Sequence, residues 1–403
     1  MAQALLNEAR ALGADLSALR RAIHAEPELG LHTPHTRDKV LAALAGLPIT
    51  WRQGASTTGL VGLLRGGAGP ATGHRPTVLL RGDMDALPMA EETGLPFASR
   101  IANTMHACGH DAHTAMLVGA ARLLAARADS LPGDVLLMFQ PGEEGHHGAR
   151  FMLEDGLIDP IPDAAFALHV MPNAPHGQVQ GRAGALMASA DQIDIVVRGA
   201  GGHASTPQDA ADPIPVACEI VSAIQAMVTR QFNAHDPVVV TIARIIAGTT
   251  HNVIPDSASM RGTMRSLSAP HRALLQDRLR RLVEGIAAAH GLQGTLTVAP
   301  GFPVSVCDPR AVDLGEAVVG DLFGAEAFHR LSAPIMWAED FAYVLERAPG
   351  AMFFLGVAGE GVDHTACNGI HSPRMVVDEA ALPRGSALLA GLALRFLDRG
   401  FAA

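Results

Sequence analysis

The chain has 403 residues, of which 48% are hydrophobic and 17% are charged, and its formal net charge is −10. This length is enough for two or three domains, each with its own core. The acidic balance, without a basic stripe or a run of Lys and Arg, argues against nucleic acid and anionic membranes as partners.

The amino-terminal element is an amphipathic helix over residues 1–21, rich in Ala, Leu and Arg. It lacks the apolar centre of a signal peptide, and we expect no apolar run to approach the ~20 residues of a membrane span. The cysteines are scattered without the spacing of a disulfide framework, so the cytoplasm is the expected compartment. They are Cys108, Cys218, Cys307 and Cys367.

Short apolar runs over 77–81, 134–140 and 164–168 alternate with helices expected over 112–127 and 149–155. This rhythm is typical of the buried strands of a mainly parallel sheet. Open α/β folds place their ligands at the carboxyl ends of such strands. We therefore expect the polar residues after the three runs to meet at one sheet edge: Asp83, Asp85, Glu143, Glu144 and His169.

The densest group of potential metal ligands is the segment HACGHDAH at 106–113. Cys108 and His110 lie two residues apart and can converge on one cation if the segment is extended. A thiolate combined with imidazoles suits zinc or a neighbouring transition metal. A fourth apolar run, 351–356, leads through a Gly-rich loop to His371.

After Met187 the pattern changes to the order β-α-β-β-α-β, which is the split ferredoxin-like unit. We expect an inserted domain over 188–298 and a discontinuous catalytic domain over 1–187 and 299–403. The elements expected in the insert are a strand at 191–198, a helix at 213–230, strands at 237–247 and 257–265, a helix at 270–290 and a strand at 294–299.

Six motifs follow one another in the chain: RGDMDALP at 81–88, HACGHD at 106–111, QPGEEG at 140–145, GGHA at 201–204, NVIPD at 252–256 and EDF at 339–341. In order and spacing they resemble the dinuclear-metal amidohydrolases, relatives of the zinc exopeptidases that include hippurate hydrolase, N-acyl-amino-acid aminoacylases and plant indole-acetyl-amino-acid hydrolases. The resemblance implies an α/β, zinc-exopeptidase-like catalytic domain with an inserted α+β lid and dimerisation domain. It also implies a homodimer, with a tetramer as the alternative.

The same resemblance assigns a ligand set for two divalent metal ions per chain. Cys108 would be a thiolate that bridges both ions. Zinc is the preferred metal, and manganese, cobalt and nickel are alternatives because the ligands are mixed. One ion would be held by Glu144 and His371, and the other by His110 and His169.

The resemblance leaves Glu143 as the general base. Glu144 uses its carboxylate on a metal, whereas Glu143 stays free to take a proton from water and pass it to the leaving nitrogen. Asp85 would orient a metal-ligating imidazole or thiolate, as carboxylates do behind ligating histidines. Asp83 would assist from the same loop.

In the inserted domain, His203 would donate a hydrogen bond to the oxyanion of the tetrahedral intermediate in the neighbouring subunit's active site. Asn252 would hold polar groups of the substrate. Arg265 is a candidate for steering a substrate carboxylate, with a solvated strand end as the alternative. The chain departs from the usual pattern at Pro207-Gln208, where relatives often have Pro-His, and substrate preference is expected to differ accordingly.

Several other side chains allow two interpretations. Without the resemblance, His371 is interpreted as a surface histidine, and Cys367 and His364 are alternative ligands in its loop. His113 is interpreted as a helix-start or core histidine. The pair His146-His147 is interpreted as a surface pair rather than a cleft lining, and Cys218 as core packing.

The predicted reaction is hydrolysis of the amide bond of an N-acyl amino acid by water, giving a carboxylic acid and a free amino acid. Dipeptides are a close alternative substrate class. A metal-free cysteine hydrolase is also considered, with Cys108 as nucleophile and His110 or His169 as base. The third hypothesis is a non-enzymatic scaffold that is stabilised by structural metals. Glu143 argues against it, because a closed structural site has no use for a spare carboxylate.

Overall fold

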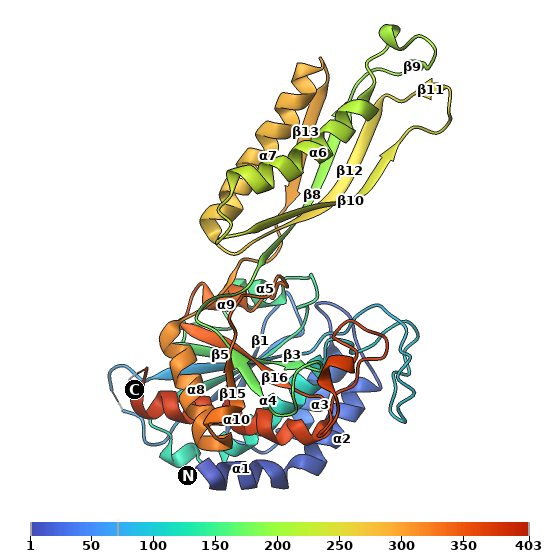
Figure 1. Cartoon of the computed structure of the whole chain (residues 1–403). Helices are drawn as coiled ribbons and strands as arrows, with labels where there is room; N and C mark the ends of the chain where they lie inside the picture. Colours follow the sequence, from blue (N-terminus) through green and yellow to red (C-terminus); the bar gives the residue numbers. More distant parts are fainter. Residues whose placement is uncertain (1, 71, 402–403) are drawn as a thin grey trace. The chain divides into compact units, whose positions relative to one another are not determined.

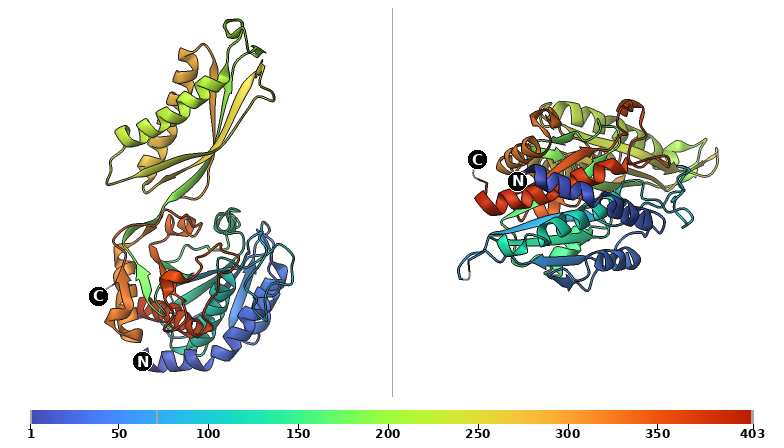
Figure 2. Two further views of the ribbon diagram at one scale, coloured as in Figure 1. Left: turned by 45° about the vertical axis from the view of Figure 1, so that its right-hand side comes forward. Right: turned by 90° about the horizontal axis from the view of Figure 1, so that it is seen from below.

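The computed structural model describes residues 2–70 and 72–401. The chain forms two compact units, which can be followed in Figures 1 and 2. The first comprises Met1–Leu186, Val306–Ala333 and Asp340–Ala403, and the second comprises Met187–Ser305 and Pro334–Glu339. The expected insert, 188–298, lies within the second unit. That unit also takes in 299–305 and 334–339, which the sequence pattern does not assign to it.

The first unit is built on an eight-stranded mixed sheet in the order β1-β2-β4-β3-β5-β16-β6-β15. β4, β3, β5 and β16 run parallel to one another, while β2 is antiparallel to β4, β1 to β2 and β6 to β16. The predicted α/β class with a mainly parallel sheet is therefore confirmed. The strands are β1 (Ile49–Gln53), β2 (Leu60–Leu64), β3 (Thr77–Asp83), β4 (Asp134–Gln140), β5 (Ala164–Met171), β6 (Val179–Gly181), β15 (Phe328–Arg330) and β16 (Gly350–Gly356).

The register of the central strands places their carboxyl ends along one edge. Asp83 at the end of β3 faces Gln140 at the end of β4, and Arg81 faces Ala167 in β5. All seven residues of β4 and all eight of β5 are buried. Strands buried on both faces carry near-continuous apolar runs, which is why the sequence shows them without alternation.

Helices α4 and α10 contact each other and lie against β3 and β5. In the view from below in Figure 2, α10 lies beside the amino-terminal α1. Within the described residues, the helix expected over 1–21 is two helices, which are separated at Leu12. The helices of this unit are α1 (Ala2–Ala11), α2 (Gly13–His24), α3 (Pro34–Ala43), α4 (His110–Ala125), α5 (Gly148–Glu154), α8 (Pro309–Phe323), α9 (Ala342–Leu345) and α10 (Leu382–Arg399).

Residues 379–399, which include α10, have the length and hydropathy of a membrane span, contrary to the expectation that no run would. Within this segment, 78% of the 18-residue apolar stretch is buried inside the structure. A core helix passes the same test on length and composition, because it too is apolar on most sides. The burial of this segment fits a core helix.

The second unit contains the elements predicted for it in the predicted order. They form a four-stranded antiparallel sheet, β10-β12-β8-β13, with two helices whose apolar sides meet one sheet face around Ile195, Ile220 and Val283. Cys218 is exposed rather than in this core, because the buried stripe of α6 runs through Val216, Ala217, Ile220 and Ile224. The elements are β8 (Ser189–Arg198), α6 (Pro213–Gln231), β10 (Val238–Ala247), β12 (Ser257–Ser266), α7 (Ala269–Ala289) and β13 (Gln293–Ala299).

Shorter elements complete the two units. β9 and β11 pair in antiparallel fashion and carry His203. β7 and β14 form a second two-stranded sheet. The bounds are β7 (Gly184–Met187), β9 (Gly202–His203), β11 (Val253–Ile254) and β14 (Ser305–Cys307), with 3-10 turns at Ala128–Ser130, Pro207–Asp209, Ala325–Ala327, His364–Ala366 and Glu379–Ala381.

Candidate metal centre

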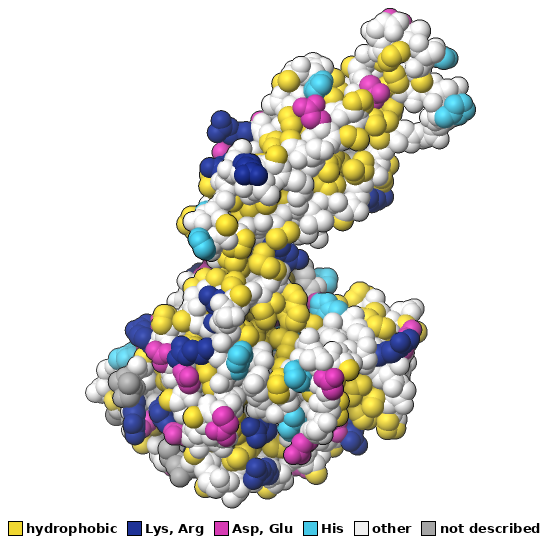
Figure 3. Space-filling view, viewed as in Figure 1, with side chains coloured by type: hydrophobic (Ala, Val, Ile, Leu, Met, Phe, Trp, Pro, Cys, Tyr) yellow, Lys and Arg dark blue, Asp and Glu magenta, His cyan; other side chains and the backbone are white. Residues whose placement is uncertain are grey.

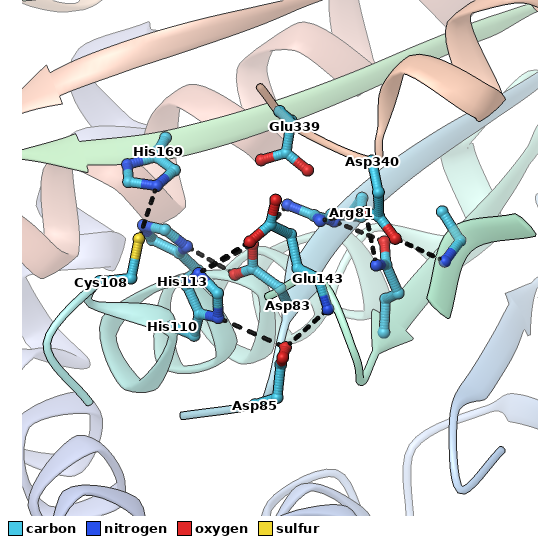
Figure 4. Close-up of polar contacts among 12 residues, drawn as sticks. Arg81, Asp83, Asp85, Cys108, His110, His113, Glu143, His169, Glu339 and Asp340 are labelled. Carbon is cyan, nitrogen blue, oxygen red and sulfur yellow. Dashed lines mark hydrogen bonds and ion pairs between the residues drawn. The ribbon is translucent and has the colours of Figure 1, made fainter. Parts of the chain in front are cut away.

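The predicted ligands of the first unit meet at the carboxyl edge of the parallel strands, as Figure 4 shows for several of them. Gly109 allows the turn between Cys108 and His110 to pack closely against Val170. Its φ of 88° is in the left-handed region, and a Cβ there would lie 2.4 Å from Val170 Cγ2. Glycine adopts this conformation without steric cost. Cys108 can therefore precede the turn while His110 begins α4 directly after it.

Two groups of ligand atoms share one sulfur. In each group the ligand atoms lie within 4.8 Å of one another. Cys108 Sγ lies 3.3 Å from His169 Nε2, and His371 Nε2 lies 3.3 Å from Glu144 Oε1. The groups are Cys108, His110 and His169 in one and Cys108, Glu144 and His371 in the other.

The protonation state of His169 suits a ligand. Its Nδ1 donates to the carbonyl of Val170 at 2.7 Å, which leaves the lone pair of Nε2 directed at Cys108. Second-shell hydrogen bonds of this kind set the tautomer of metal-ligating histidines. Burial lowers the pKa of His169 well below its ordinary value, so the ring is neutral.

His110 and Glu144 carry buried polar atoms that no hydrogen bond from the described part of the chain satisfies, as expected of metal ligands. Both ring nitrogens of His110 and Oε1 of Glu144 are buried and make no hydrogen bond within residues 2–70 and 72–401, although carboxylates lie 3.5 Å from His110 and His371 lies 3.3 Å from Glu144. Buried polar atoms are normally paired. Burial would lower the pKa of His110, but Asp83 and Asp85 raise it to about 10. The surroundings thus favour positive charge here, and the thiolate, imidazole and carboxylate donors fit a divalent transition metal.

His371 is the most exposed of the proposed ligands, with 51% of its side chain accessible. Its φ of 63° lies in the left-handed region, which costs a non-glycine residue about 1 kcal/mol or more. Its backbone N–H donates to the carbonyl of Ala107 at 2.7 Å, which ties this loop to the Cys108 segment. Neither Cys367 nor His364 belongs to a ligand group in the described part of the chain.

Asp85 holds the glutamate pair rather than chiefly an imidazole or thiolate. Its two oxygens accept the backbone N–H groups of Glu143 and Glu144 at 2.9 and 3.0 Å. Its distance to His110 Nδ1 is longer, at 3.5 Å. The orienting role of Asp85 stays a prediction, and its shortest contacts are those with the backbone of the two glutamates.

Asp83 is bound to two side chains that the sequence interpretation did not connect with it. His113 Nε2 accepts the backbone N–H of Val170 at 2.8 Å, so its Nδ1 carries the proton that it donates to Asp83 at 2.6 Å. Arg81 donates to the other oxygen of Asp83. Asp83, His110 and His113 also lie close enough to hold a metal, but the atoms of Asp83 and His113 are already engaged. His113 is a buried core histidine at the start of α4, as predicted.

The pair His146-His147 is not simply a surface pair. His146 is exposed, whereas His147 is half-buried and has a φ of 60°. The Nδ1 of His147 lies 2.9 Å from the hydroxyl of Tyr343, the single tyrosine of the chain.

In the second unit, His203 and Asn252 are adjacent. The backbone N–H of Ala204 donates to the carbonyl of Asn252 at 3.2 Å. The Nδ1 of the exposed His203 accepts the backbone N–H of Ser205 at 3.1 Å. In the neutral ring this acceptor role places the proton on Nε2, which is therefore a hydrogen-bond donor.

Arg265 does not join His203 and Asn252 within the second unit. It lies near the carboxyl end of β12, opposite Val239 and Ala190, whereas the β9–β11 pair precedes the start of that strand at Ser257. Arg265 is eight positions further along the strand than Ser257, a distance of roughly 26 Å. Burial lowers the pKa of Arg265 and Asp191 opposes this effect.

Comparison with known proteins agrees with this arrangement. Residues 79–395 match the peptidase family M20/M25/M40. The chain belongs to this family. It is a hydrolase of the amidohydrolase and peptidase type, and the resemblance stated from its motifs is confirmed.

Individual M20 relatives cover almost the whole chain. This chain is 37% identical to IAA-amino acid hydrolase ILR1-like 2 of Arabidopsis thaliana, over 94% of this chain and 84% of the relative. It is 36% identical to thermostable carboxypeptidase 1 of Saccharolobus solfataricus, over 99% of this chain and 100% of the relative. The fold is similar to the crystal structure of the Bacillus subtilis YXEP protein, described as a dinuclear metal binding peptidase from the M20 family, with a TM-score of 0.82, 34% identity and coverage of 96% and 99%.

Proposed function

We propose that this protein hydrolyses the amide bond of N-acyl amino acids with two divalent metal ions bound per chain. The observation that carries the proposal is the position of Cys108 in both ligand groups. A bridged pair of ions requires one donor that belongs to both coordination spheres. The relatives named for hydrolysis of an amino-acid conjugate and for binding two metals support the substrate class and the metal count.

When bound, the ions would supply Lewis-acid chemistry that activates water and polarises the scissile carbonyl. Glu143 takes a proton from the attacking water as the water oxygen bonds to the carbonyl carbon. It returns that proton to nitrogen as the C–N bond breaks, which releases the carboxylic acid and the free amino acid. Asp85 supports both roles of the glutamate pair because it binds the two backbone N–H groups.

The identity of the metal is part of the proposal. Zinc is favoured because thiolate, imidazole and carboxylate are its usual ligands, and manganese, cobalt and nickel bind the same donors. Metal analysis after growth in mixed metals would distinguish them.

We further propose a homodimer in which His203 serves the partner's site, with a tetramer as the alternative. β10 is an edge strand whose outer side has no strand partner within the described part of the chain. It exposes Ile245 and Ile246 at 51% and 49%, and Figure 3 shows hydrophobic side chains on the side of the unit where β10 lies. Apolar edges of this kind pair readily with another strand. The Nε2–H of His203 would donate to the oxyanion.

Two alternatives have specific support. The 36% identity to a carboxypeptidase favours short peptides as a second substrate class. The 3.3 Å distance between Cys108 Sγ and His169 Nε2 would also suit a thiol nucleophile and its base. A chelator and a thiol reagent separate the last alternative, because a cysteine hydrolase keeps its activity in EDTA and loses it to iodoacetamide.

The decisive experiment is a hydrolysis screen of N-acyl amino acids and dipeptides with the metal-reconstituted protein, combined with metal analysis. We expect close to two divalent ions per chain, and Cys108→Ala should lose both. The matched control is Cys367→Ala, which alters a thiol in the His371 loop and should keep both ions. Full retention of both ions by Cys108→Ala would contradict the bridging role and favour the nucleophile.

A further inference from the structure

The loop that carries the glutamate pair contains one strained non-glycine residue, His147. This base loop (residues 141–149) leaves the end of β4 and enters α5. Three of its residues, Gly142, Gly145 and His147, have φ values of 73°, 77° and 60° in the left-handed region. The two glycines adopt this region without steric cost, whereas the strained backbone of His147 persists only where the surrounding structure holds it.

Two buried carboxylates supply that support at separate points. Asp85 binds the backbone of Glu143 and Glu144, as described above. Asp340 Oδ2 accepts the backbone N–H of Ala149 at 2.9 Å, at the far end of the loop. Asp340 and Ala149 are fully buried.

The second oxygen of Asp340 is tied to the start of the same loop. Asp340 Oδ1 accepts from Gln140 Nε2 at 2.7 Å and from Arg81 Nη2 at 3.1 Å, and Arg81 Nε donates to Gln140 Oε1 at 2.8 Å. Figure 4 shows these contacts around Asp340. Gln140 is the last residue before the base loop and Ala149 is its last residue. One carboxylate therefore fixes the distance between the two ends of the loop.

We propose that Asp340 is a positioning residue for catalysis: it holds both ends of the base loop so that Glu143 stays in reach of the attacking water. This inference rests on the proposed role of Glu143 as general base. Displacement of a catalytic group by about 1 Å can cost on the order of 10²-fold in rate. A purely structural Asp340 would instead affect unfolding and leave turnover unchanged.

The test is Asp340→Asn in the metal-loaded enzyme. The amide keeps the size of the side chain, but its NH2 group must face either the N–H of Ala149 or the donors of Gln140 and Arg81. One end of the loop is then released. We expect kcat to fall by roughly 10- to 100-fold with KM changed by less than about threefold. Metal content should stay as in the wild type.

A second measurement does not depend on activity. Amide hydrogen exchange within residues 141–149 should accelerate by about tenfold or more in Asp340→Asn, because a released segment opens more often. If this exchange stays at the wild-type rate in the folded variant, the proposal is wrong. This holds even if the protein hydrolyses none of the amides offered, an outcome that would overturn the proposed function instead.

The matched control lies at the opposite end of the same strand. Asp134 begins β4, accepts the backbone N–H of Gly66 at 3.1 Å and pairs with Arg75 at 2.8 Å. Asp134→Asn removes the same kind of buried carboxylate contact away from the base loop. It should lower stability, with kcat within about twofold of wild type and exchange over 141–149 unchanged.

A double-mutant cycle checks that Asp340 acts through the base. In a Glu143→Gln background, Asp340→Asn should lower the residual rate by less than about twofold, because the group that it positions is no longer a base. Independent, multiplicative losses would overturn the proposal. If Asp340→Asn does not fold, Asp340→Glu replaces it: the charge for Arg81 is kept, but one added methylene shifts the loop, and the same cycle applies with a several-fold loss expected.

Discussion

Cys108, His110 and His169 in the first unit are buried, and carboxylates and backbone groups of that unit surround them. His203 in the second unit is exposed, and its ring is held by Ser205, two residues further along. The buried cluster is completed by the fold of its own unit. The exposed imidazole has a fixed tautomer but needs a ligand or a partner surface to act on. Fold stability and metal binding should therefore depend on the first region, and assembly-dependent catalysis on the second.

The largest effect is expected for Glu143→Gln in the buried cluster. The change keeps size and hydrogen bonding but removes the base, so kcat should fall by roughly 10²–10⁴-fold while metal content stays. Glu144→Gln is the matched variant on the neighbouring residue, and it should lose metal as well as activity. If metal analysis and kinetics gave the reverse, base and ligand would be assigned the wrong way round.

The exposed side is tested by His203→Ala, which should lower kcat by on the order of 10²–10³-fold with metal binding intact. Mixing this variant with Glu143→Gln under conditions of subunit exchange probes whether sites are shared. A mixed dimer would contain one site with both residues intact and should regain part of the activity. No recovery despite proven exchange would place His203 in its own chain's site or outside catalysis.

The buried polar groups next to the metal centre predict a pH dependence of stability. Burial alone would lower the pKa of His24, but Asp111 and Glu91 outweigh it and raise the pKa from 6.5 to about 9. A raised pKa stabilises the folded state fully below about pH 6.5, and this contribution is lost as pH rises toward 9. We expect the free energy of unfolding to fall by up to about 3 kcal/mol over that interval.

Urea unfolding between pH 6 and pH 9 measures this effect. His24→Gln should abolish most of the decline, whereas His35→Gln, at an exposed position, should keep it. Parallel declines in the wild type and in His24→Gln would show that other groups carry the pH dependence.

The smallest expected effect concerns the second unit. Asp212 caps α6 by accepting the backbone N–H of Ile214 at 2.9 Å. Asp212→Ala should cost about 1 kcal/mol of stability and leave kcat within about twofold, because Ser205 orients His203 locally. Asp212→Asn restores a capping side chain and should recover most of the loss. A large fall in kcat for Asp212→Ala would show that His203 depends on more than its own turn.

The sequence was sufficient for the strands and for the ligand edge because both follow from short-range patterns. β3, β4 and β5 are largely apolar runs with polar residues at or after their carboxyl ends, and parallel strands bring such residues together. The split ferredoxin-like order follows from alternation in β8, where Ile193, Ile195 and Val197 are buried. Motif resemblance supplied the roles of the ligands, which spacing alone left open.

The remaining features depend on three-dimensional contacts that have no local signal. Asp85 binds two backbone N–H groups 58 and 59 residues away, and Asp340 meets Ala149 across 191 residues. Arg81 is the one sequence signal for these contacts, because a charge inside an apolar strand requires a buried partner. The break between α1 and α2 and the assignment of 334–339 to the second unit likewise depend on tertiary packing.

Asp85 binds the backbone N–H groups of Glu143 and Glu144, and this arrangement bears on the order in which the enzyme folds and binds metal. The glutamates are aligned by an aspartate of their own unit, and the cluster lies among buried apolar residues, so we expect the polypeptide to reach its native fold before any ion binds. This order differs from that of small zinc domains, in which ion binding and folding are one event. Loading would then be a late step on a finished protein. Which cation occupies the centre in a cell would depend on supply at that moment rather than on the folding reaction.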